Sequence, residues 1–302
     1  MFIIRSVDSH FDLTNPSNIH RLTTENFLPH GLSKPKSVKA PKQNKMKISV
    51  AQIQPAAGDI QGNISLHKTW IERAIAEQAD FIAFPELSLT AYEPELAGEL
   101  AIDQDDFRLE AFQKISDRSG IAIGLGAPTK SGRGIHISMI VFQPHQGRTI
   151  YSKQILHHDE KPFFVEGHEP LLLTIGGKKV LPAICYESLR KEHAKYINAL
   201  GSDIYLASVA KPQNGMEKAF AHYREIAAKF SVPVLLTNSV GYCDDFQSAG
   251  QSAVWGADGT IKDKLKSGTE GLLIWDTETE TVIKQEAHAA DQIGGWEKIS
   301  RE

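Results

Sequence analysis

The sequence predicts a layered protein of the α/β or α+β class, in which helices pack against β-sheets. Short apolar, β-branched runs, which are typical of buried strands, alternate along the chain with segments whose apolar residues repeat every three to four positions, as in amphipathic helices. The chain has 302 residues, of which 41% are hydrophobic and 23% charged. These values are ordinary for a globular protein, and the length fits either one large domain or two small ones.

The same periodicities give the expected elements. Leu66, Trp70 and Ala74 share one face of the first helix, and the pair Gly176-Gly177 favours a hairpin turn. Helices are expected at 63–78, 103–118, 189–200 and 216–230. Strands are expected at 47–53, 81–84, 121–126, 138–142, 149–153, 180–184, 203–208, 234–238, 252–255 and 271–275.

The two ends of the chain differ from its middle. Residues 1–45 contain several prolines and are basic, without sustained periodicity, and we expect a poorly ordered N-terminal extension there. Met46 directly precedes the first strand, so the extension is also consistent with a segment upstream of the true start. A folded domain is expected at 46–280, followed by a charged C-terminal tail at 281–302 that wraps the surface or another subunit.

Composition disfavours several classes of protein. The formal net charge is −4 and the pI about 6.3, whereas nucleic-acid binders usually carry a basic face. Two cysteines in a chain of this length do not indicate a disulfide framework and fit a reducing compartment. No apolar run is long enough to cross a bilayer, and the first residues do not resemble a signal peptide. We therefore expect a cytoplasmic protein that binds neither nucleic acid nor membranes.

Three reactive side chains stand where short apolar strands are expected to end. Glu86, Lys153 and Cys185 each come directly at the end of such a run. A strand end above a packed sheet is a rigid place to mount a reactive group. Three such ends converge if their strands are neighbours.

These three residue types are chemically complementary. A thiol is a strong nucleophile only as the thiolate, so it needs a base or a cation nearby. A carboxyl group in apolar surroundings has a raised pKa and exchanges protons near neutral pH. An ammonium group stabilises the oxyanion that forms when a thiolate attacks an amide or nitrile carbon. The set predicts Cys185 as nucleophile, Glu86 as base and Lys153 as cation, with the backbone N–H of Tyr186 as a second oxyanion donor.

Around these residues the sequence resembles the nitrilase, or carbon–nitrogen hydrolase, superfamily, and the resemblance runs from about residue 47 to 275. Five segments in the order of the family carry it: 84–92 (FPELSLTAY), 151–156 (YSKQIL), 160–167 (EKPFFVEG), 183–187 (AICYE) and 250–259 (GQSAVWGADG). They resemble the catalytic-glutamate motif, the catalytic-lysine motif, the segment of a second glutamate, the nucleophile motif and a late strand and turn.

The resemblance implies a single αββα sandwich domain, a Glu-Lys-Cys triad, frequent dimerisation and neither a metal nor an organic cofactor. It also implies a mechanism in which Glu86 takes the proton of Cys185, Lys153 holds the oxyanion, and water hydrolyses the thioester. Glu160 falls on the second glutamate and would position Lys153 or the substrate. Tyr92 is a candidate for the lining of the substrate pocket.

The sequence departs from the family pattern at several places. Ala91 stands where many members have glycine, and Glu166 and Ala257 replace common prolines. Residues 189–192 (LRKE) keep only the last residue of a common Arg-Phe-Pro-Glu. None of these changes removes a catalytic group, but they lie near pocket-lining positions and leave the substrate unassigned.

Each candidate also has a purely structural interpretation. Cys185 could be a buried, inert cysteine, and Lys153 could be a solvated lysine on a strand edge. Glu86 could cap a helix or lie on the surface, Glu160 could belong to a polar loop, and Tyr92 could pack in the core.

The segment His157-His158-Asp159-Glu160, with His168 nearby, raises the question of a metal site. Adjacent histidines of an extended segment point to opposite sides, and the spacing matches no zinc signature. We therefore expect no metal.

Three functions are compatible with the sequence. The preferred one is hydrolysis of a small linear amide, such as an ω-amide or an N-carbamoyl compound, by a homodimer or higher homo-oligomer. An acyltransferase that passes the thioester to an amine uses the same chemistry. A binding protein with an idle triad is the third, since a fold alone does not establish an activity.

Overall fold

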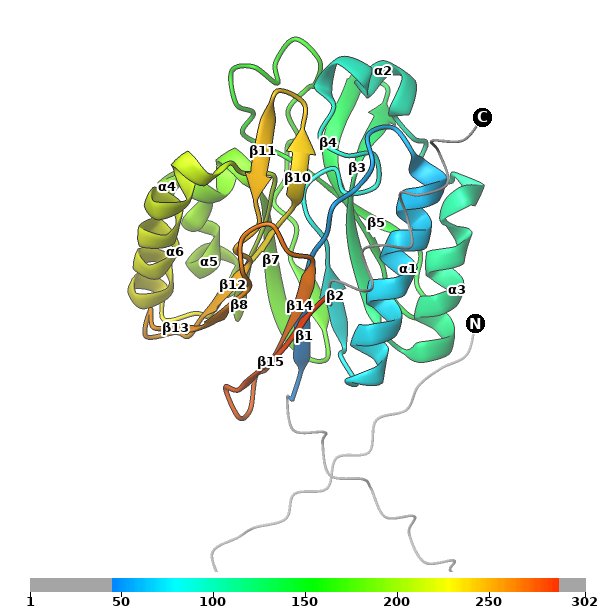
Figure 1. Cartoon of the computed structure of the whole chain (residues 1–302). Coiled ribbons are helices and arrows are strands. Elements are labelled where there is room, and N and C mark those ends of the chain that lie inside the picture. The colour runs from blue at the N-terminus through cyan, green and yellow to red at the C-terminus, as the bar shows by residue number, and fades with distance from the viewer. Residues whose placement is uncertain (1–44, 288–302) are drawn as a thin grey trace, which may run out of the picture. The chain divides into compact units, whose positions relative to one another are not determined.

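Two β-sheets lie face to face between layers of helices in the computed structural model, which describes residues 45–287 (Figure 1). The first sheet has the order β15-β14-β1-β2-β3-β4-β5. Its strands are β1 (Lys47–Gln52), β2 (Phe81–Ala83), β3 (Ala122–Ser131), β4 (Gly134–Phe142), β5 (Thr149–Ser152), β14 (Gly271–Asp276) and β15 (Val282–Glu286). Strands β1, β2 and β3 are parallel, while β3, β4 and β5 pair antiparallel in succession, so β5 runs in the direction of β2.

The second sheet has the order β13-β12-β9-β8-β7-β6, with β7, β8 and β9 parallel. Its strands are β6 (Leu173–Ile175), β7 (Lys178–Ile184), β8 (Ile204–Val209), β9 (Val234–Asn238), β12 (Ala253–Trp255) and β13 (Ile261–Lys264). A separate hairpin of β10 (Val240–Cys243) and β11 (Phe246–Ala249) stands above the sheets at the top of Figure 1.

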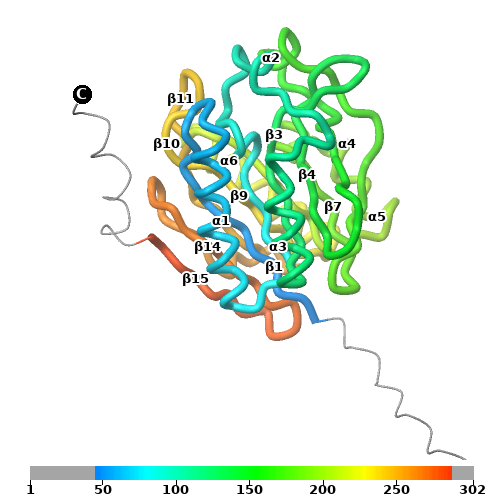
Figure 2. The backbone as a smooth tube through the Cα atoms, turned by 90° about the vertical axis from the view of Figure 1, so that its right-hand side faces the viewer, coloured from blue at the N-terminus to red at the C-terminus, as the bar shows by residue number. Residues whose placement is uncertain are grey.

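Helices cover the outer face of each sheet. Figure 2 shows α1 (Ile60–Ala76) and α3 (Glu110–Ser119) side by side over the first sheet. The second sheet is covered by α4 (Lys191–Ala194), α5 (Tyr196–Leu200) and α6 (Met216–Phe230). The short α2 (Ala97–Leu100) and the 3-10 turns η1 (Pro94–Leu96), η2 (Phe107–Leu109), η3 (Cys185–Leu189) and η4 (Gln213–Gly215) lie in the connections. No helix within residues 45–287 is long and apolar enough to cross a membrane.

Three buried apolar clusters define the layers. One contains residues of both sheets, such as Val50 and Leu206, and therefore fills the space between them. A second joins the first sheet to α1 and α3, and a third joins the other sheet to α4, α5 and α6. The predicted αββα sandwich is thus confirmed.

Local signals explain where several helices begin and end. The Asp59 side chain accepts a hydrogen bond from the backbone N–H of Gly62 at 2.9 Å, so α1 begins three residues before the predicted start. Gly120 ends α3 with φ +76°, a left-handed conformation that glycine adopts without strain. The helix predicted at 103–118 is shorter than expected, because it begins only at Glu110 after a 3-10 turn.

The sequence missed several elements. The segment 189–200 forms two short helices instead of one, and β10, β11, β13 and β15 were not predicted, while β6 was implied only by the expected hairpin. Strand β13 has the polar sequence IKDK, and β15 is a partly exposed edge strand within the segment expected to be the tail, so neither carries an apolar alternation. The hairpin predicted at Gly176-Gly177 is present, with φ values of +58° and +83° in the turn between β6 and β7.

Candidate active site

The three predicted reactive residues lie together at one end of the two sheets. Because β5 runs in the direction of β2, the carboxyl ends of both strands meet at the same edge of the first sheet. Glu86 and Lys153 follow these two ends, and the Lys153 Nζ donates a hydrogen bond to Glu86 Oε1 at 2.8 Å. Cys185 follows β7 in the facing sheet.

Glu86 is held by backbone contacts from both sheets. Its side chain is buried, and its Oε2 accepts a hydrogen bond from the backbone N–H of Ala210 at 3.3 Å. On the other side, β3 approaches the Glu86 turn very closely at Gly126, where a Cβ would lie 2.3 Å from the N of Leu87 and 2.4 Å from the O of Pro85. Only glycine allows this approach, so Gly126 fixes the height of Glu86 above the sheet.

Lys153 is fully buried between two carboxylates. Its Nζ donates to Glu86 Oε1 at 2.8 Å and to Glu160 Oε1 at 2.5 Å. The backbone turn after β5 is closed by Gly167, whose N–H donates to the Lys153 carbonyl at 2.7 Å. The ammonium has three N–H groups, so two are directed at these carboxylates and the third has no partner among residues 45–287.

Three groups donate hydrogen bonds to the Glu160 carboxylate. Besides Lys153, the Tyr92 hydroxyl donates to its Oε1 at 3.1 Å and the backbone N–H of His157 donates to its Oε2 at 2.7 Å. Tyr92 is nearly buried, and its ring packs on Phe246 of β11 with a centroid distance of 5.7 Å. Tyr92 therefore packs in the core and also binds Glu160, while its place in the lining of the substrate pocket stays a prediction.

Cys185 stands at a sharp turn from strand to 3-10 helix. It has φ +47°, a left-handed conformation that costs a residue other than glycine about 1 kcal/mol or more. The side chain is half-buried, and its Sγ lies 3.8 Å from the carbonyl oxygen of Ala210. Backbone strain of this kind clusters at functional sites, because the surrounding structure must hold it in place.

Burial and neighbouring charges set the proton affinities of the site. Burial raises the pKa of Glu86, against the opposing effects of the Lys153 charge and of hydrogen bonds from Lys153 and Cys185. Burial and the Glu86 charge raise the pKa of the Cys185 thiol, so the resting group is the neutral thiol. Burial alone would lower the pKa of Lys153, but the charges of the facing acidic groups outweigh it, and the ammonium stays protonated.

A third carboxylate, Glu187, connects the turns of the nucleophile and the lysine. Its Oε1 accepts hydrogen bonds from the Tyr151 hydroxyl at 2.6 Å and from the Ile184 N–H at 2.7 Å. Its Oε2 accepts from the Gln154 N–H at 2.6 Å. The sequence analysis assigned no role to Glu187. Its position in the nucleophile motif, two residues after Cys185, could have indicated one.

The histidine segment is not extended, so the geometric argument against a metal does not hold here. It lies in a turn, in which the His157 and His158 rings are 4.3 Å apart between centroids, and the ligand atoms of His157, His158 and Asp159 lie within 4.8 Å of one another. The His157 Nδ1 is already 2.5 Å from Asp159 Oδ1, and its ring packs against Tyr186 at 5.0 Å. This packing places Tyr186 on the outer side of the nucleophile turn.

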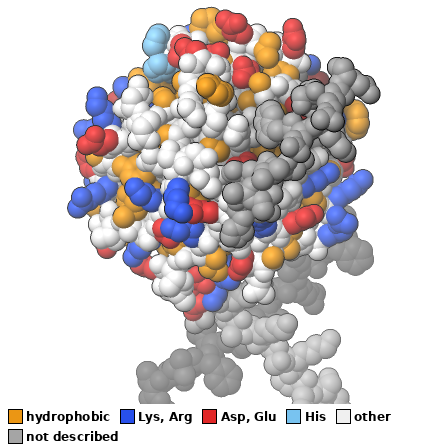
Figure 3. Space-filling model, in the orientation of Figure 1, with side chains coloured by type: hydrophobic (Ala, Val, Ile, Leu, Met, Phe, Trp, Pro, Cys, Tyr) orange, Lys and Arg blue, Asp and Glu red, His pale blue; other side chains and the backbone are white. Residues whose placement is uncertain are grey.

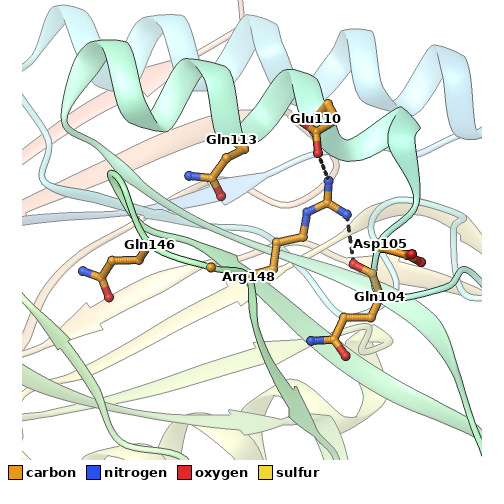
Figure 4. Close-up of a pocket in the computed structure, with 7 residues that line it drawn as sticks. Gln104, Asp105, Glu110, Gln113, Gln146 and Arg148 are labelled. Atoms are coloured by element: carbon orange, nitrogen blue, oxygen red, sulfur yellow. Dashed lines mark hydrogen bonds and ion pairs between the residues drawn. The ribbon is translucent and has the colours of Figure 1, made fainter.

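A surface hollow of about 690 Å³ lies elsewhere, beside α3 and the turn before β5 (Figure 4). Within it Arg148 Nη2 donates to Glu110 Oε1 at 2.9 Å and Nη1 to the Gln104 carbonyl at 2.9 Å. Its cation is therefore already paired, and none of the predicted site residues lines it. Acidic and basic side chains are interspersed over the face turned to the viewer in Figure 3, as the near balance of charges leads one to expect.

Several curated proteins are similar to this chain in sequence. It is 27% identical over 239 residues to a glutamine-dependent NAD(+) synthetase of Acinetobacter baylyi, covering 75% of this chain and 43% of the synthetase. It is 25% identical to an aliphatic nitrilase of Rhodococcus rhodochrous, covering 84% and 77% of the two chains. The chain thus spans less than half the length of the synthetases it matches.

Solved structures share the fold. An amidase from Nesterenkonia sp. AN1, in complex with acrylamide, matches with a TM-score of 0.70 and 22% identity over 78% of this chain and 92% of the amidase. The glutamine-dependent NAD+ synthetase from Acinetobacter baumannii matches with a TM-score of 0.70 and 24% identity over 81% of this chain and 48% of the synthetase.

The family model described as carbon–nitrogen hydrolase matches residues 47–286, which is most of the chain. This range contains both sheets and every residue of the site described above. The chain therefore belongs to the carbon–nitrogen hydrolase family.

Proposed function

We propose that this protein hydrolyses a small linear amide through a thioester on Cys185. The observation that carries the proposal is the meeting of a thiol, a buried carboxylate and a buried ammonium at the ends of three strands. Glu86 and Lys153 are in direct hydrogen-bond contact, and the Ala210 backbone touches both Glu86 and Cys185. A neutral thiol beside a carboxylate with a raised pKa is suited to attack with concurrent proton transfer.

In the first half-reaction Cys185 Sγ attacks the amide carbon while Glu86 takes the thiol proton. The remaining N–H of Lys153 and the backbone N–H of Tyr186 hold the oxyanion, because the first N–H groups of a helical turn have no partner within it. Collapse of this intermediate breaks the carbon–nitrogen bond, and Glu86 returns the proton to the leaving nitrogen. The products are the thioester and an amine or ammonia.

In the second half-reaction water attacks the thioester carbon and gives a proton to Glu86. The same donors hold the second oxyanion. The carbon–sulfur bond breaks, Glu86 returns its proton to the Cys185 thiolate, and the carboxylic acid leaves. Glu160 keeps Lys153 in place throughout, since its Oε1 lies 2.5 Å from Nζ. Every step uses side chains and backbone of this chain, and none needs a metal or cofactor.

Two of the similar proteins support an amide as substrate. One is named a glutamine-dependent synthetase, and glutamine carries a primary amide. Another is an amidase, also solved in complex with butyramide. These likenesses favour an unbranched primary amide over a peptide.

Turnover and adduct formation test the proposal together. Purified protein is incubated with a panel of primary amides, N-carbamoyl amines and nitriles, and ammonia release is measured. The Cys185→Ser and Cys243→Ser variants serve as test and control, because Cys243 is buried and its Sγ contacts the Ser239 hydroxyl rather than Glu86, Lys153 or Cys185. Loss of ammonia release only in Cys185→Ser, and a mass increase on Cys185 by one acyl group, is the expected result. Absence of both signals across the panel with folded protein rejects the proposal.

We also propose that two copies associate through helices α4 and α6. These helices border a hollow of about 130 Å³ on the outer face of the second sheet, whose lining includes Ile226 and Phe230. The family resemblance favours pairing of such faces. Light scattering should give the mass of a dimer, and Phe230→Asp should shift it to that of a monomer, whereas an unchanged monomer mass in both would contradict the proposal.

A further inference from the structure

A second lysine stands beside the nucleophile. Lys211 lies just after β8 and directly follows Ala210, whose N–H donates to Glu86 Oε2 at 3.3 Å and whose carbonyl oxygen is 3.8 Å from Cys185 Sγ. Lys211 is thus one residue away from a backbone group that touches both reacting side chains. Neither the motifs nor the proposed mechanism assigns it a role.

The backbone of Lys211 is firmly fixed. Its N–H is within hydrogen-bond distance of Asn238 Oδ1 at 2.9 Å and of Ser248 Oγ at 3.1 Å. Its carbonyl accepts a hydrogen bond from the backbone N–H of Ala249 at 2.9 Å. The end of β9 and the strand β11 therefore hold this position, as a recognition group on a rigid scaffold requires.

The side chain of Lys211 brings a second positive charge to the site. It is half-buried and folds against Gly215, where a Cβ would lie only 2.9 Å from Nζ. Its charge, like that of Lys153, lowers the pKa of the Cys185 thiol against the dominant effect of burial. Glycine at 215 leaves room for the ammonium at this place.

The two lysines differ in their partners. Lys153 is paired with Glu86 and Glu160. Within residues 45–287, the Lys211 ammonium forms neither an ion pair nor a hydrogen bond with another side chain. A partly desolvated ammonium without a counter-ion is unfavourable, and an anionic group of a ligand would compensate it.

We propose that Lys211 binds a carboxylate of the substrate, so that the enzyme acts on monoamides of dicarboxylic acids rather than on neutral or cationic amides. This inference rests on the proposed amide hydrolysis. The formal charges of Glu86, Glu160, Lys153 and Lys211 sum to zero while the thiol is neutral. A singly charged carboxylate brings this sum to −1, whereas a doubly charged phosphate would bring it to −2 beside two buried carboxylates, so the carboxylate is the more favourable ligand.

Kinetics on a matched pair of substrates test the inference. Glutaramate, the monoamide of glutaric acid, and valeramide have chains of equal length and differ in the terminal carboxylate. We expect the wild type to prefer glutaramate, and Lys211→Met to lower the ratio of kcat/KM values by about 30-fold or more, mainly through KM. Lys211→Arg should restore much of the ratio. Lys218→Met, which removes an exposed lysine of α6, should leave the ratio unchanged.

Two kinetic results would overturn the inference. One is a wild-type enzyme that turns over valeramide as well as glutaramate, which would leave the proposed hydrolysis intact. The other is a Lys211→Met variant in which both substrates slow equally and the pH profile of Cys185 alkylation by acrylamide shifts, since Lys211 would then act on the thiol alone.

Measuring the binding of glutaramate to an inactive variant tests the carboxylate site independently of hydrolysis. Calorimetry on Cys185→Ser should detect glutaramate and give a several-fold weaker affinity in Cys185→Ser combined with Lys211→Met. Binding that is insensitive to Lys211 rejects the carboxylate site, even if no amide is hydrolysed. Selective binding without any hydrolysis by the wild type counts against the proposed function instead.

Discussion

Lys153 is the residue on which the electrostatics of the site depend. One ammonium, fully buried, lies within 2.8 Å of Glu86 and 2.5 Å of Glu160. A buried charge is tolerable only when its partners are well placed. Two carboxylates facing one ammonium leave a net negative charge beside the thiol. Lys153 therefore needs both partners for its position, while of the two carboxylates Glu86 is the one that hydrogen-bonds to the Cys185 side chain.

Replacing Glu160 by glutamine tests this division of roles. The change removes the charge that holds Lys153 but keeps the size of the side chain, so kcat should fall about 100-fold through misplacement of the ammonium. Steady-state kinetics on an amide substrate measure it. Glu166→Gln is the control, since Glu166 only accepts a 3.5 Å contact from the Leu156 N–H. Equal losses in both variants would contradict the assigned role.

Sequence reasoning could find some of these residues and not others. Glu86, Lys153 and Cys185 were predicted because each directly follows an apolar run, and proximity in space followed from the strand order. Lys211 also follows a strand, but a lysine after an apolar run is an ordinary surface feature. Only its backbone anchors and its lack of an acidic partner distinguish it, and these are properties of the folded chain.

At the scale of elements, the site depends on how closely strand ends approach one another. Gly126 lets β3 come against the Glu86 turn, and Gly124, two residues earlier on the same strand, faces only side chains. At Gly124 a Cβ would lie 3.1 Å from Phe81 Cζ and 3.2 Å from Met139 Sδ, contacts that small side-chain shifts relieve. An alanine at 126 would therefore crowd backbone atoms and an alanine at 124 would crowd side chains, so the two substitutions can be compared directly.

Gly126→Ala should reduce both stability and activity. The added Cβ meets backbone atoms that cannot rotate away, so we expect the free energy of unfolding to fall by about 1–3 kcal/mol or more and kcat to fall with it. Gly124→Ala should cost less stability and keep kcat close to that of the wild type. Denaturant unfolding and amide kinetics on both variants provide the measurement. Normal kcat in Gly126→Ala would show that the Glu86 turn does not need this approach.

Glu187 couples the ends of β5 and β7 and makes stability depend on pH. Burial raises its pKa from 4.5 to about 7, against hydrogen bonds from Tyr151 and the backbone. Because the folded state holds the proton more tightly than the unfolded state, its contribution to stability is full below pH 4.5 and is lost as pH rises to about 7. The loss is on the order of 3 kcal/mol.

Glu187→Gln should therefore give a protein that is less stable overall but whose unfolding free energy changes less between pH 4.5 and 7. Its amide would also face the N–H groups of Ile184 and Gln154, which need an acceptor. Urea unfolding across this pH range measures the slope. If the unfolding free energy of the variant changes with pH as steeply as that of the wild type, a group other than Glu187 causes the pH dependence.

At the scale of the whole molecule, the two sheets act as one body because they share a core. Leu206 of β8 is fully buried in the cluster between the sheets. The Ser208 hydroxyl donates to the Phe84 carbonyl of the facing sheet at 2.9 Å, and the Thr237 hydroxyl donates to the Ala51 carbonyl. The site is built across this interface, so it cannot form before the sheets pack.

Leu206→Ala should lower the free energy of unfolding by about 2–5 kcal/mol, as expected for a cavity in a packed core. Leu96→Ala, at a site that is 38% exposed, should cost much less. Loss of tertiary signal in the near-ultraviolet and of secondary structure in the far-ultraviolet should coincide in both. Separate transitions would mean that the sheets unfold independently.

The layered architecture was predictable because buried strands and amphipathic helices carry strong apolar periods. Helix α6 matches its predicted range at both ends, and so does strand β9. The edges were not predictable: β13 and β15 are polar and partly exposed, and their pairing depends on neighbours that are distant in sequence. Tertiary contacts, rather than local propensity, define such strands.

The strand order of the first sheet has a consequence for synthesis on the ribosome. Strand β1 is among the first elements to be translated, yet its neighbour β14 begins only at Gly271. Until that late segment emerges, one side of a nearly fully buried strand offers unpaired N–H and C=O groups to any other nascent chain. A polypeptide truncated before β14 should therefore aggregate, even though it already contains Glu86, Lys153 and Cys185.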